Sequence, residues 1–274
     1  MSAAPRDEQR PSRKSVRLRR SGAVAELRLD RPAAHNALSS AMLGELRAAC
    51  VKLAGDPALA AVVLSSTDPV AFCVGADLKE RAGFSDDELV AQRPLLSAAF
   101  AALRAIPVPV VAAVGGYAVG GGYELALSCD VIVAGEGAVV GLPEVSRGLI
   151  PGGGGTQLLQ RRAGSGVAAE LIYSGRLVAA PEALQRGLVD RLVAGGSEQG
   201  EALALAGEIA GNSPLAVRSA KRALLLGADL ALERGLEVEE AAWRRVALSE
   251  DRREGIRAFV EKRPPVWPPS VDAL

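Results

Sequence analysis

Three glycine-rich segments constrain this chain most, because each falls where a strand is expected to end and a helix to begin. They are residues 72–79 (FCVGADLK), 115–124 (GGYAVGGGYE) and 142–156, which ends in a run of four glycines and a threonine. Glycine permits positive φ and lets a ligand approach the backbone closely. The N–H groups at a helix start have no intrahelical partner and favour negative charge. Two such turns facing one ligand oxygen would form an oxyanion hole.

The glycine turns do not have the spacing of nucleotide-binding loops. No Gly-x-x-x-x-Gly-Lys-Ser/Thr sequence is present, and Gly116, Gly120 and Gly121 do not form Gly-x-Gly-x-x-Gly. After Gly152 and Gly154, the position of a third glycine is taken by Gln157. Nucleotide-cofactor motifs are therefore absent from the sequence.

Strand and helix signals alternate in the first half of the chain, and helical signals dominate from Thr156 onward. Apolar runs and alternation predict strands near 16–20, 23–29, 61–64, 108–114 and 131–134. Helices are predicted at about 40–54, from Ser85 toward Arg104 after a capping-box sequence, and from about Gly121. This order predicts an α/β domain with a parallel sheet and a helical C-terminal region.

Composition excludes several classes of protein. The 274 residues are 49% hydrophobic, which suits one large domain, and the 32 basic and 32 acidic residues balance. The cysteines Cys50, Cys73 and Cys129 are far apart, which indicates neither a disulfide framework nor a zinc site. One histidine, His35, excludes a multi-histidine metal site. We expect no metal and a reducing, cytoplasmic location.

The N-terminal residues are polar and basic. Residues 1–14 contain two prolines and no signal-peptide pattern, and we expect them to form a mobile tail. The basic residues of 1–20 are expected to be solvated, although an RNA-binding arm is an open alternative. The uncharged stretch 105–123 contains two prolines and five glycines, so a buried strand and turn explain it better than a membrane span.

Two carboxylates, Glu124 and Glu144, adjoin the glycine turns. Each alone would complement a helix dipole, which is worth roughly 0.3–1 kcal/mol. A pair beside turns that could bind an oxyanion indicates acid–base chemistry instead. The sequence shows only that the two are 20 residues apart on different elements.

Several motifs in order make the chain resemble the crotonase, or enoyl-CoA hydratase/isomerase, family over nearly its whole length. They are 31–32 (RP), 36–38 (NAL), 75–79 (GADLK), 120–125 (GGGYEL), 143–144 (PE), 151–157 (PGGGGTQ) and 259–264 (FVEKRP). The resemblance implies a ClpP-like spiral of ββα units over residues 15–200, which would hold the active site. Residues 201–274 would form a helical region for trimerisation and for the CoA and acyl pocket, in a homotrimer or a dimer of trimers.

The same resemblance implies roles for particular residues. The amides of Ala76 and Gly121 would bind the thioester carbonyl oxygen, and Glu124 and Glu144 match the catalytic glutamates of the hydratases. The loop residues Asp77, Leu78 and Lys79 would contact substrate, and Phe259 and Lys262 would help bind CoA, often across a subunit boundary. No metal or redox cofactor is implied, since CoA is part of the substrate.

The implied reaction is hydration of trans-2-enoyl-CoA to 3-hydroxyacyl-CoA in fatty-acid or related acyl-CoA metabolism. One alternative is a 3,2-enoyl-CoA isomerase, which needs one base, so the presence of both glutamates favours the hydratase. A second is an RNA-binding homologue with residual hydratase activity. We expect Tyr123 to pack rather than to line the pocket, His35 to make a local hydrogen bond, and Cys73 and Cys129 to be inert. Pocket walls are expected from the region after Asp77 and from the C-terminal helices.

Overall fold

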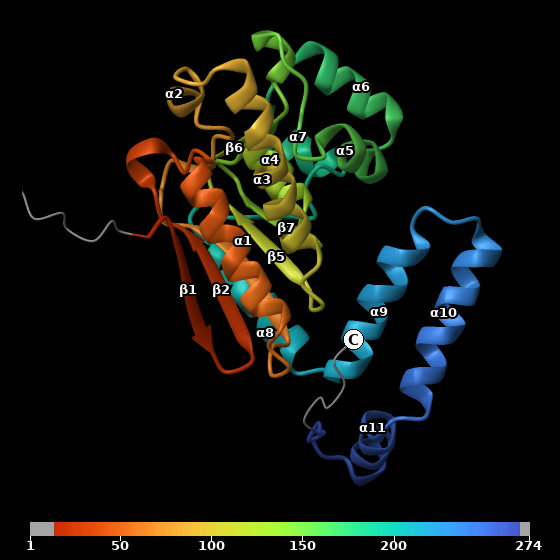
Figure 1. The fold of residues 1–274 in the computed structure, drawn as a ribbon. Coiled ribbons are helices and arrows are strands. Elements are labelled where there is room, and N and C mark those ends of the chain that lie inside the picture. The colour runs from red at the N-terminus through yellow and green to blue at the C-terminus, as the bar shows by residue number, and fades with distance from the viewer. Residues whose placement is uncertain (1–13, 269–274) are drawn as a thin grey trace, which may run out of the picture.

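A computed structural model describes residues 14–268 as two sheets surrounded by helices (Figure 1). The expected N-terminal tail, apart from Lys14, lies outside the described residues. The mixed α/β architecture predicted from the sequence is confirmed, and its strands and helices follow one another as repeated ββα units.

The larger sheet has six strands in the order β1-β2-β3-β5-β7-β10. Its first two strands form an antiparallel hairpin, and the other pairs are parallel, as predicted. The two central strands read AVVLSS and VVAAV and are buried along almost their whole length, which is typical of parallel strands covered on both faces. The bounds are β1 Val16–Ser21, β2 Val24–Leu29, β3 Ala61–Ser66, β5 Val110–Val114, β7 Val131–Gly135 and β10 Arg191–Val193.

The smaller sheet has four short strands in the order β4-β6-β8-β9. Each of its first three strands directly follows a strand of the larger sheet, so successive ββ pairs add one strand to each sheet. This alternation generates the spiral that the resemblance implies. The bounds are β4 Ala71–Cys73, β6 Tyr117–Val119, β8 Val139–Gly141 and β9 Val178–Ala179.

Helices cover both faces of the larger sheet. On one face α1 (Ser40–Ala54) and α3 (Asp86–Arg104) bury their apolar stripes in the main core, with alternate strand residues such as Val62 and Leu64. On the other face α8 (Glu198–Ala210) packs on Ala61 and Val63. The predicted capping box begins α3, with Ser85 and Glu88 each bonded to the other's backbone. The remaining helices of the core are α2 Leu78–Arg81, α4 Gly121–Leu127, α5 Gly155–Ala163, α6 Ser165–Ser174 and α7 Ala180–Gln185.

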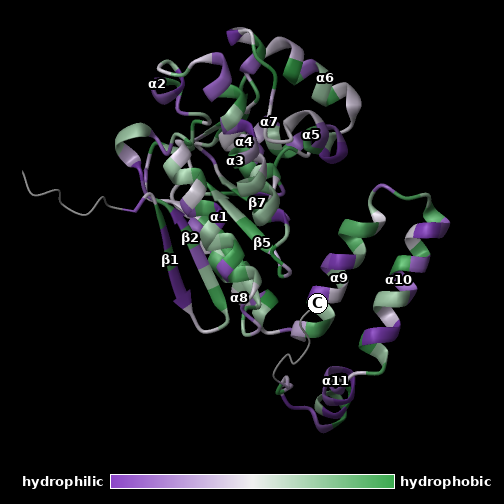
Figure 2. Ribbon diagram, viewed as in Figure 1, coloured by the Kyte–Doolittle hydropathy of each residue, from purple (hydrophilic) through white to green (hydrophobic). Residues whose placement is uncertain are grey.

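Three C-terminal helices form an arm that projects from the sheets (Figure 1). They are α9 (Pro214–Gly227), α10 (Leu232–Ala247) and α11 (Glu250–Glu261); the division expected at residue 200 falls inside α8. Buried polar groups tie α9 to the core, because Lys221 Nζ donates to Asp130 Oδ2 (2.6 Å) and to the Val108 carbonyl (2.9 Å). Figure 2 shows hydrophobic residues along α9 and α10. Within residues 14–268, no helix has both the length and the apolarity to cross a bilayer.

Candidate active site

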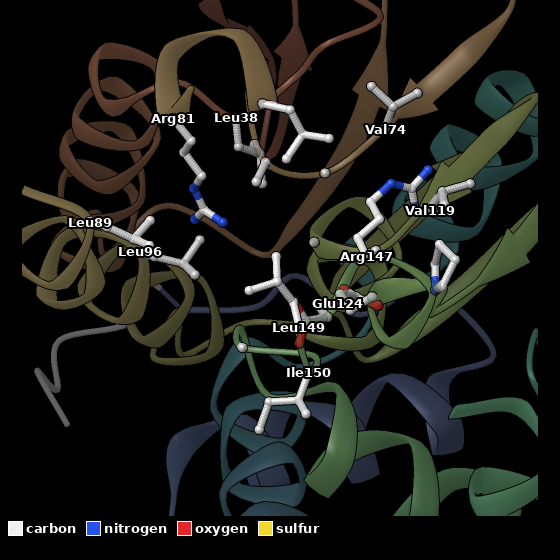
Figure 3. Close-up of a pocket in the computed structure, with 18 of the residues that line it drawn as sticks. Leu38, Val74, Arg81, Leu89, Leu96, Val119, Glu124, Arg147, Leu149 and Ile150 are labelled. Carbon is white, nitrogen blue, oxygen red and sulfur yellow. The ribbon is translucent and has the colours of Figure 1, made fainter. Parts of the chain in front are cut away.

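A pocket of about 350 Å³ lies where the glycine turns meet α2 and α3 (Figure 3). Its walls come from three stretches of chain: the turn at 74–76, the turn at 119–121 and the segment 143–152, with α2 and α3 opposite. The region after Asp77 therefore contributes to the pocket walls, as expected. All lining residues fall between 38 and 152, so the C-terminal helices of this single chain supply none of them.

Two backbone amides, those of Ala76 and Gly121, meet at this pocket. Leu38 fixes the first turn, because its N–H donates to the Gly75 carbonyl (2.7 Å) and its own carbonyl accepts from the Asp77 N–H (3.3 Å). Across the turn, a Cβ on Gly121 would lie 3.7 Å from Ala76 N. Among the described residues no acceptor is bonded to the N–H of Ala76 or of Gly121. The two amides are thus adjacent donors at one wall.

The close approach of these turns requires glycine at two further positions. Gly75 has φ +86°, and a Cβ there would lie 2.9 Å from both Gly121 N and the Val119 carbonyl oxygen. Gly120 has φ +56°, and a Cβ there would lie 3.1 Å from Glu144 Oε1. Both φ values are in the region that side chains disfavour.

Glu124 lies in the first turn of α4 and is 2% exposed. Its Oε1 accepts hydrogen bonds from the amides of Gly153 and Gly155, both at 2.7 Å. Burial raises the pKa of the Glu124 carboxyl, although these amides and the charge of Arg93 oppose the rise. The four-glycine run therefore holds one carboxylate oxygen in place by its backbone, and Glu124 still borders the pocket.

Glu144 begins a short 3₁₀ helix, Glu144–Arg147, directly after β8 and Pro143. Its Oε2 is buried and has no hydrogen-bond partner within residues 14–268. Burial, reinforced by the negative charge of Glu124, raises the pKa of Glu144 to about 7, while its own backbone N–H and Arg147 oppose the rise. A partly buried carboxylate that has one buried, unpaired oxygen and a pKa raised toward neutrality is characteristic of functional sites.

The structure brings some of the predicted site residues together and not others. Ala76, Leu78, Gly121, Glu124 and Glu144 all line the pocket. The other predicted substrate-binding residues do not line it: Asp77, Lys79, Phe259 and Lys262.

The side chain of Asp77 is used within the fold. It accepts from the amides of Lys79 and Glu80 at the start of α2 and pairs with Arg31 Nη1 at 2.6 Å. Burial alone would raise the pKa of Asp77, but the Arg31 guanidinium and the two amides hold it below its usual value. Phe259 is 85% exposed on α11, and Lys262 follows that helix, in the projecting arm (Figure 1).

Several expectations about non-catalytic residues are confirmed. Tyr123 is fully buried and its hydroxyl donates to the Leu188 carbonyl (2.9 Å). His35 Nδ1 lies 2.8 Å from Asp68 Oδ2, which is the local bond expected. Cys73 and Cys129 are buried, and burial raises the pKa of the Cys73 thiol to about 12, so it is inert as a nucleophile.

Sequence reasoning missed three arginines that border the pocket, Arg81, Arg93 and Arg147. Arg81 Nε donates to Gln92 Oε1 (2.9 Å), and Arg93 Nη1 donates to the Gly152 carbonyl (2.7 Å). In the sequence these residues look like ordinary solvated charges on helices. Arg81 and Arg93 lie 63 and 51 residues before Glu144, so the sequence gives no signal that they share its pocket, whereas Arg147 follows Glu144 by only three residues.

The chain is similar to known proteins over most of its length. A family model described as "Enoyl-CoA hydratase/isomerase" matches residues 19–269. A 2,3-dehydroadipyl-CoA hydratase of Escherichia coli is 43% identical over 246 residues, 88% of this chain and 94% of that protein. The human methylglutaconyl-CoA hydratase is 39% identical over 88% of this chain and 73% of its own length. The crystal structure of an enoyl-CoA hydratase from Bacillus anthracis superposes with a TM-score of 0.91 at 39% identity, covering 92% of this chain and 98% of that one.

Proposed function

Because the chain belongs to the enoyl-CoA hydratase/isomerase family, we propose that it hydrates trans-2-enoyl-CoA thioesters to 3-hydroxyacyl-CoA. The observation that carries the proposal is one pocket containing two glutamates and two unpaired amides. Hydration needs both kinds of group, because a water must be activated and an enolate must be stabilised.

The amides of Ala76 and Gly121 would bind the thioester oxygen. As hydroxide adds to the β-carbon, negative charge moves onto that oxygen. Donors held by the fold stabilise this charge more than they stabilise the neutral thioester, and that difference lowers the barrier. Since the donors are backbone groups, Gly75 and Gly120 serve only to hold the turns in place.

Glu144 and Glu124 would share the proton transfers. Glu144 accepts a proton from water as the oxygen attacks the β-carbon, and Glu124 holds the same water. Glu144 then delivers this proton to the α-carbon, so water has added across the double bond and the site regains its starting protonation. The two carboxyls titrate as a coupled pair, because the charge of Glu124 acts on Glu144.

No electrons are gained or lost overall in this reaction, so the proposal includes no redox cofactor. It includes no metal because it assigns the thioester oxygen to the two amides and the water to the two glutamates. CoA acts as the handle of the substrate. A 3,2-enoyl-CoA isomerase would need one base to move a proton between carbons. The presence of two acids in one pocket supports the hydratase, since hydration gives the second acid a role in holding the water.

Hydration is tested by loss of absorbance at the enoyl thioester band with crotonyl-CoA. We expect Glu144→Gln and Glu124→Gln each to lower kcat by about 10²–10⁴-fold. Glu136→Gln is the matched control, because Glu136 is exposed in the turn after β7 and lies outside the pocket. If neither crotonyl-CoA nor a longer 2-enoyl-CoA is hydrated, the proposal is wrong; if only 3-enoyl-CoA is converted, the isomerase is correct.

We propose also that the chain self-associates through its helical arm, as a trimer or a dimer of trimers. The arm exposes large apolar side chains that a neighbouring copy would cover, including Leu224, Leu232, Trp243 and Phe259. A neighbour's Phe259 and Lys262 would then reach the CoA part of a substrate. Light scattering is expected to show a trimer or hexamer, and a monomer would contradict this arrangement.

A further inference from the structure

Arg81 presents a cation to the active-site pocket. It is the last residue of α2, is only partly exposed, and borders the cavity. Figure 3 shows its guanidinium directed into the cavity from the wall that carries Leu89 and Leu96, with Glu124 across from it. Only its Nε has a partner among the described residues, so the two terminal nitrogens are available. A guanidinium with two such nitrogens can bind a carboxylate through two parallel hydrogen bonds.

The orientation of Arg81 is fixed by buried side chains. Its Nε donates to Oε1 of Gln92, which is 6% exposed on α3. The amide nitrogen of Gln92 in turn donates to Ser40 Oγ (2.8 Å) and to Glu80 Oε2 (3.2 Å). A cation fixed in this way loses little side-chain entropy on binding an anion.

The positive charge of Arg81 is not neutralised by an ion pair. No carboxylate within residues 14–268 forms a salt bridge with it, and Glu80 is bonded to the amide of Ser40 and to Gln92. Burial lowers the pKa of Arg81, and the positive charge of Arg93 lowers it further. The negative charges of Glu80 and Glu124 raise this pKa but do not cancel the decrease. Two neighbouring cations, one of them partly buried, favour an anion at this wall.

Much of the pocket wall near Arg81 is apolar. Leu89, Val90 and Leu96 of α3 line the same wall, and Leu149 and Ile150 line the cavity opposite α3. Apolar walls with a few placed charges, among them a cation with free nitrogens, suit a hydrocarbon chain that ends in an anionic group. We infer that the preferred substrate is an enoyl thioester whose acyl chain ends in a carboxylate bound by Arg81, an inference that rests on the proposed hydratase function.

The phosphates of CoA are the other source of such an anion. Arg81 is near enough to Glu124 for that charge to act on it. The phosphates, in contrast, are separated from the thioester by the whole pantetheine arm. A cation close to the proposed acid–base pair therefore faces the acyl chain rather than the nucleotide.

The test requires no variant at first. Trans-2-enoyl-CoA thioesters of straight-chain dicarboxylic acids with five to seven carbons are compared with their ω-methyl esters, which have the same chain without the charge. We expect kcat/KM to be about 10- to 100-fold higher for the carboxylate of the best length, the range for a hydrogen-bonded charge. Equal or faster hydration of the esters at every length would overturn the inference.

Arg81→Met then assigns the preference to one side chain. The carboxylate-to-ester ratio of kcat/KM is expected to fall by about 10- to 100-fold, and Arg81→Lys is expected to retain part of it, because lysine keeps the charge but loses the paired nitrogens. Arg47→Met is the matched control, since Arg47 is exposed on α1 outside the pocket. An unchanged ratio in folded Arg81→Met would also refute the assignment.

N-acetylcysteamine thioesters distinguish the two anions, because they lack the phosphates. A carboxylate preference that survives in these thioesters supports binding of the acyl group. If Arg81→Met instead weakens every CoA thioester equally and no N-acetylcysteamine thioester, the arginine binds phosphate and the inference is wrong. Failure of the hydratase proposal is a different outcome: in that case neither the carboxylate thioesters, nor their esters, nor crotonyl-CoA would be hydrated.

Discussion

Gly75 and Gly121 approach so closely that a methyl group on the first would lie 2.9 Å from the amide nitrogen of the second. The contact joins two turns that are 46 residues apart in the chain. Each turn follows a strand of the smaller sheet, and β4 and β6 are paired neighbours in that sheet. Pairing of two short strands therefore places the amides of Ala76 and Gly121 side by side.

Gly75→Ala is expected to separate these amides. The methyl group would push Gly121 N away, and the loss of one aligned donor lowers kcat by about 10²–10³-fold. Gly22→Ala is the matched control, because Gly22 also has positive φ (+57°) but has nothing within 4 Å of the added Cβ. Both variants are expected to lose about 1–2 kcal/mol of stability from backbone strain, measured by urea unfolding. Equal activities in the two variants would contradict this role of Gly75.

Glu144→Gln is expected to stabilise the protein at alkaline pH although it lowers kcat. The pKa of Glu144 is near 7 in the fold and near 4.5 when unfolded, so the wild type loses stability as pH rises through this range and the carboxyl ionises. Allowing for partial solvent screening, the cost is about 1–2 kcal/mol above about pH 8. Glutamine has no such cost.

The measurement is the free energy of unfolding of wild type and variant between about pH 4.5 and pH 9. The free energy of unfolding of Glu144→Gln should match that of the wild type near the acid limit of this range. It should exceed the wild-type value by a constant amount near the alkaline limit. Glu136→Gln, an exposed substitution of the same kind, should show no such trend. An advantage that grows toward acid pH would mean that the fold favours the ionised carboxyl.

Gly153→Ala is expected to displace the Glu124 carboxylate. The added methyl group would overlap the ring of Phe100 and lie 2.8 Å from Glu124 Oε2. Phe100 is fully buried and cannot move aside, so the carboxylate must shift. A misplaced acid lowers kcat by about 10- to 100-fold, with KM changed less. Gly166→Ala, on α6 with open space around the new methyl, should leave kcat unchanged.

Lys221→Met is expected to loosen the attachment of the helical arm. The Lys221 side chain is 7% exposed, and its loss leaves Asp130 without its cation. We expect unfolding to become easier by about 1–3 kcal/mol, with part of the loss recovered when Asp130→Asn is added. Lys52→Met on the exposed side of α1 should change stability by less than about 0.5 kcal/mol.

Residue patterns alone predicted five of the six strands of the larger sheet, because these five are long enough for an apolar run to be recognised. The sixth, β10, has only three residues and was missed in a region expected to be helical. The predicted ranges 16–20, 61–64 and 131–134 each fall within an observed strand, and the helix at 40–54 has its observed bounds. The smaller sheet was not recognisable in this way, since its strands have only two or three residues. Only the resemblance to a spiral of ββα units implied it.

The sequence by itself determined the chemistry available: two carboxylates beside glycine turns that can expose amides, with motifs that indicate a thioester substrate. Local composition is enough for the carboxylates and the glycine turns, because glycine and glutamate act through properties that each residue carries; the thioester is implied only by the resemblance to the family. The tertiary structure decided which groups meet. It partly buried Glu144 near Glu124 and so raised the pKa of Glu144, used the Asp77 carboxylate in a helix cap, and turned Arg81 into the same pocket. Burial and charge proximity depend on segments that are distant in the chain, so no local pattern contains them.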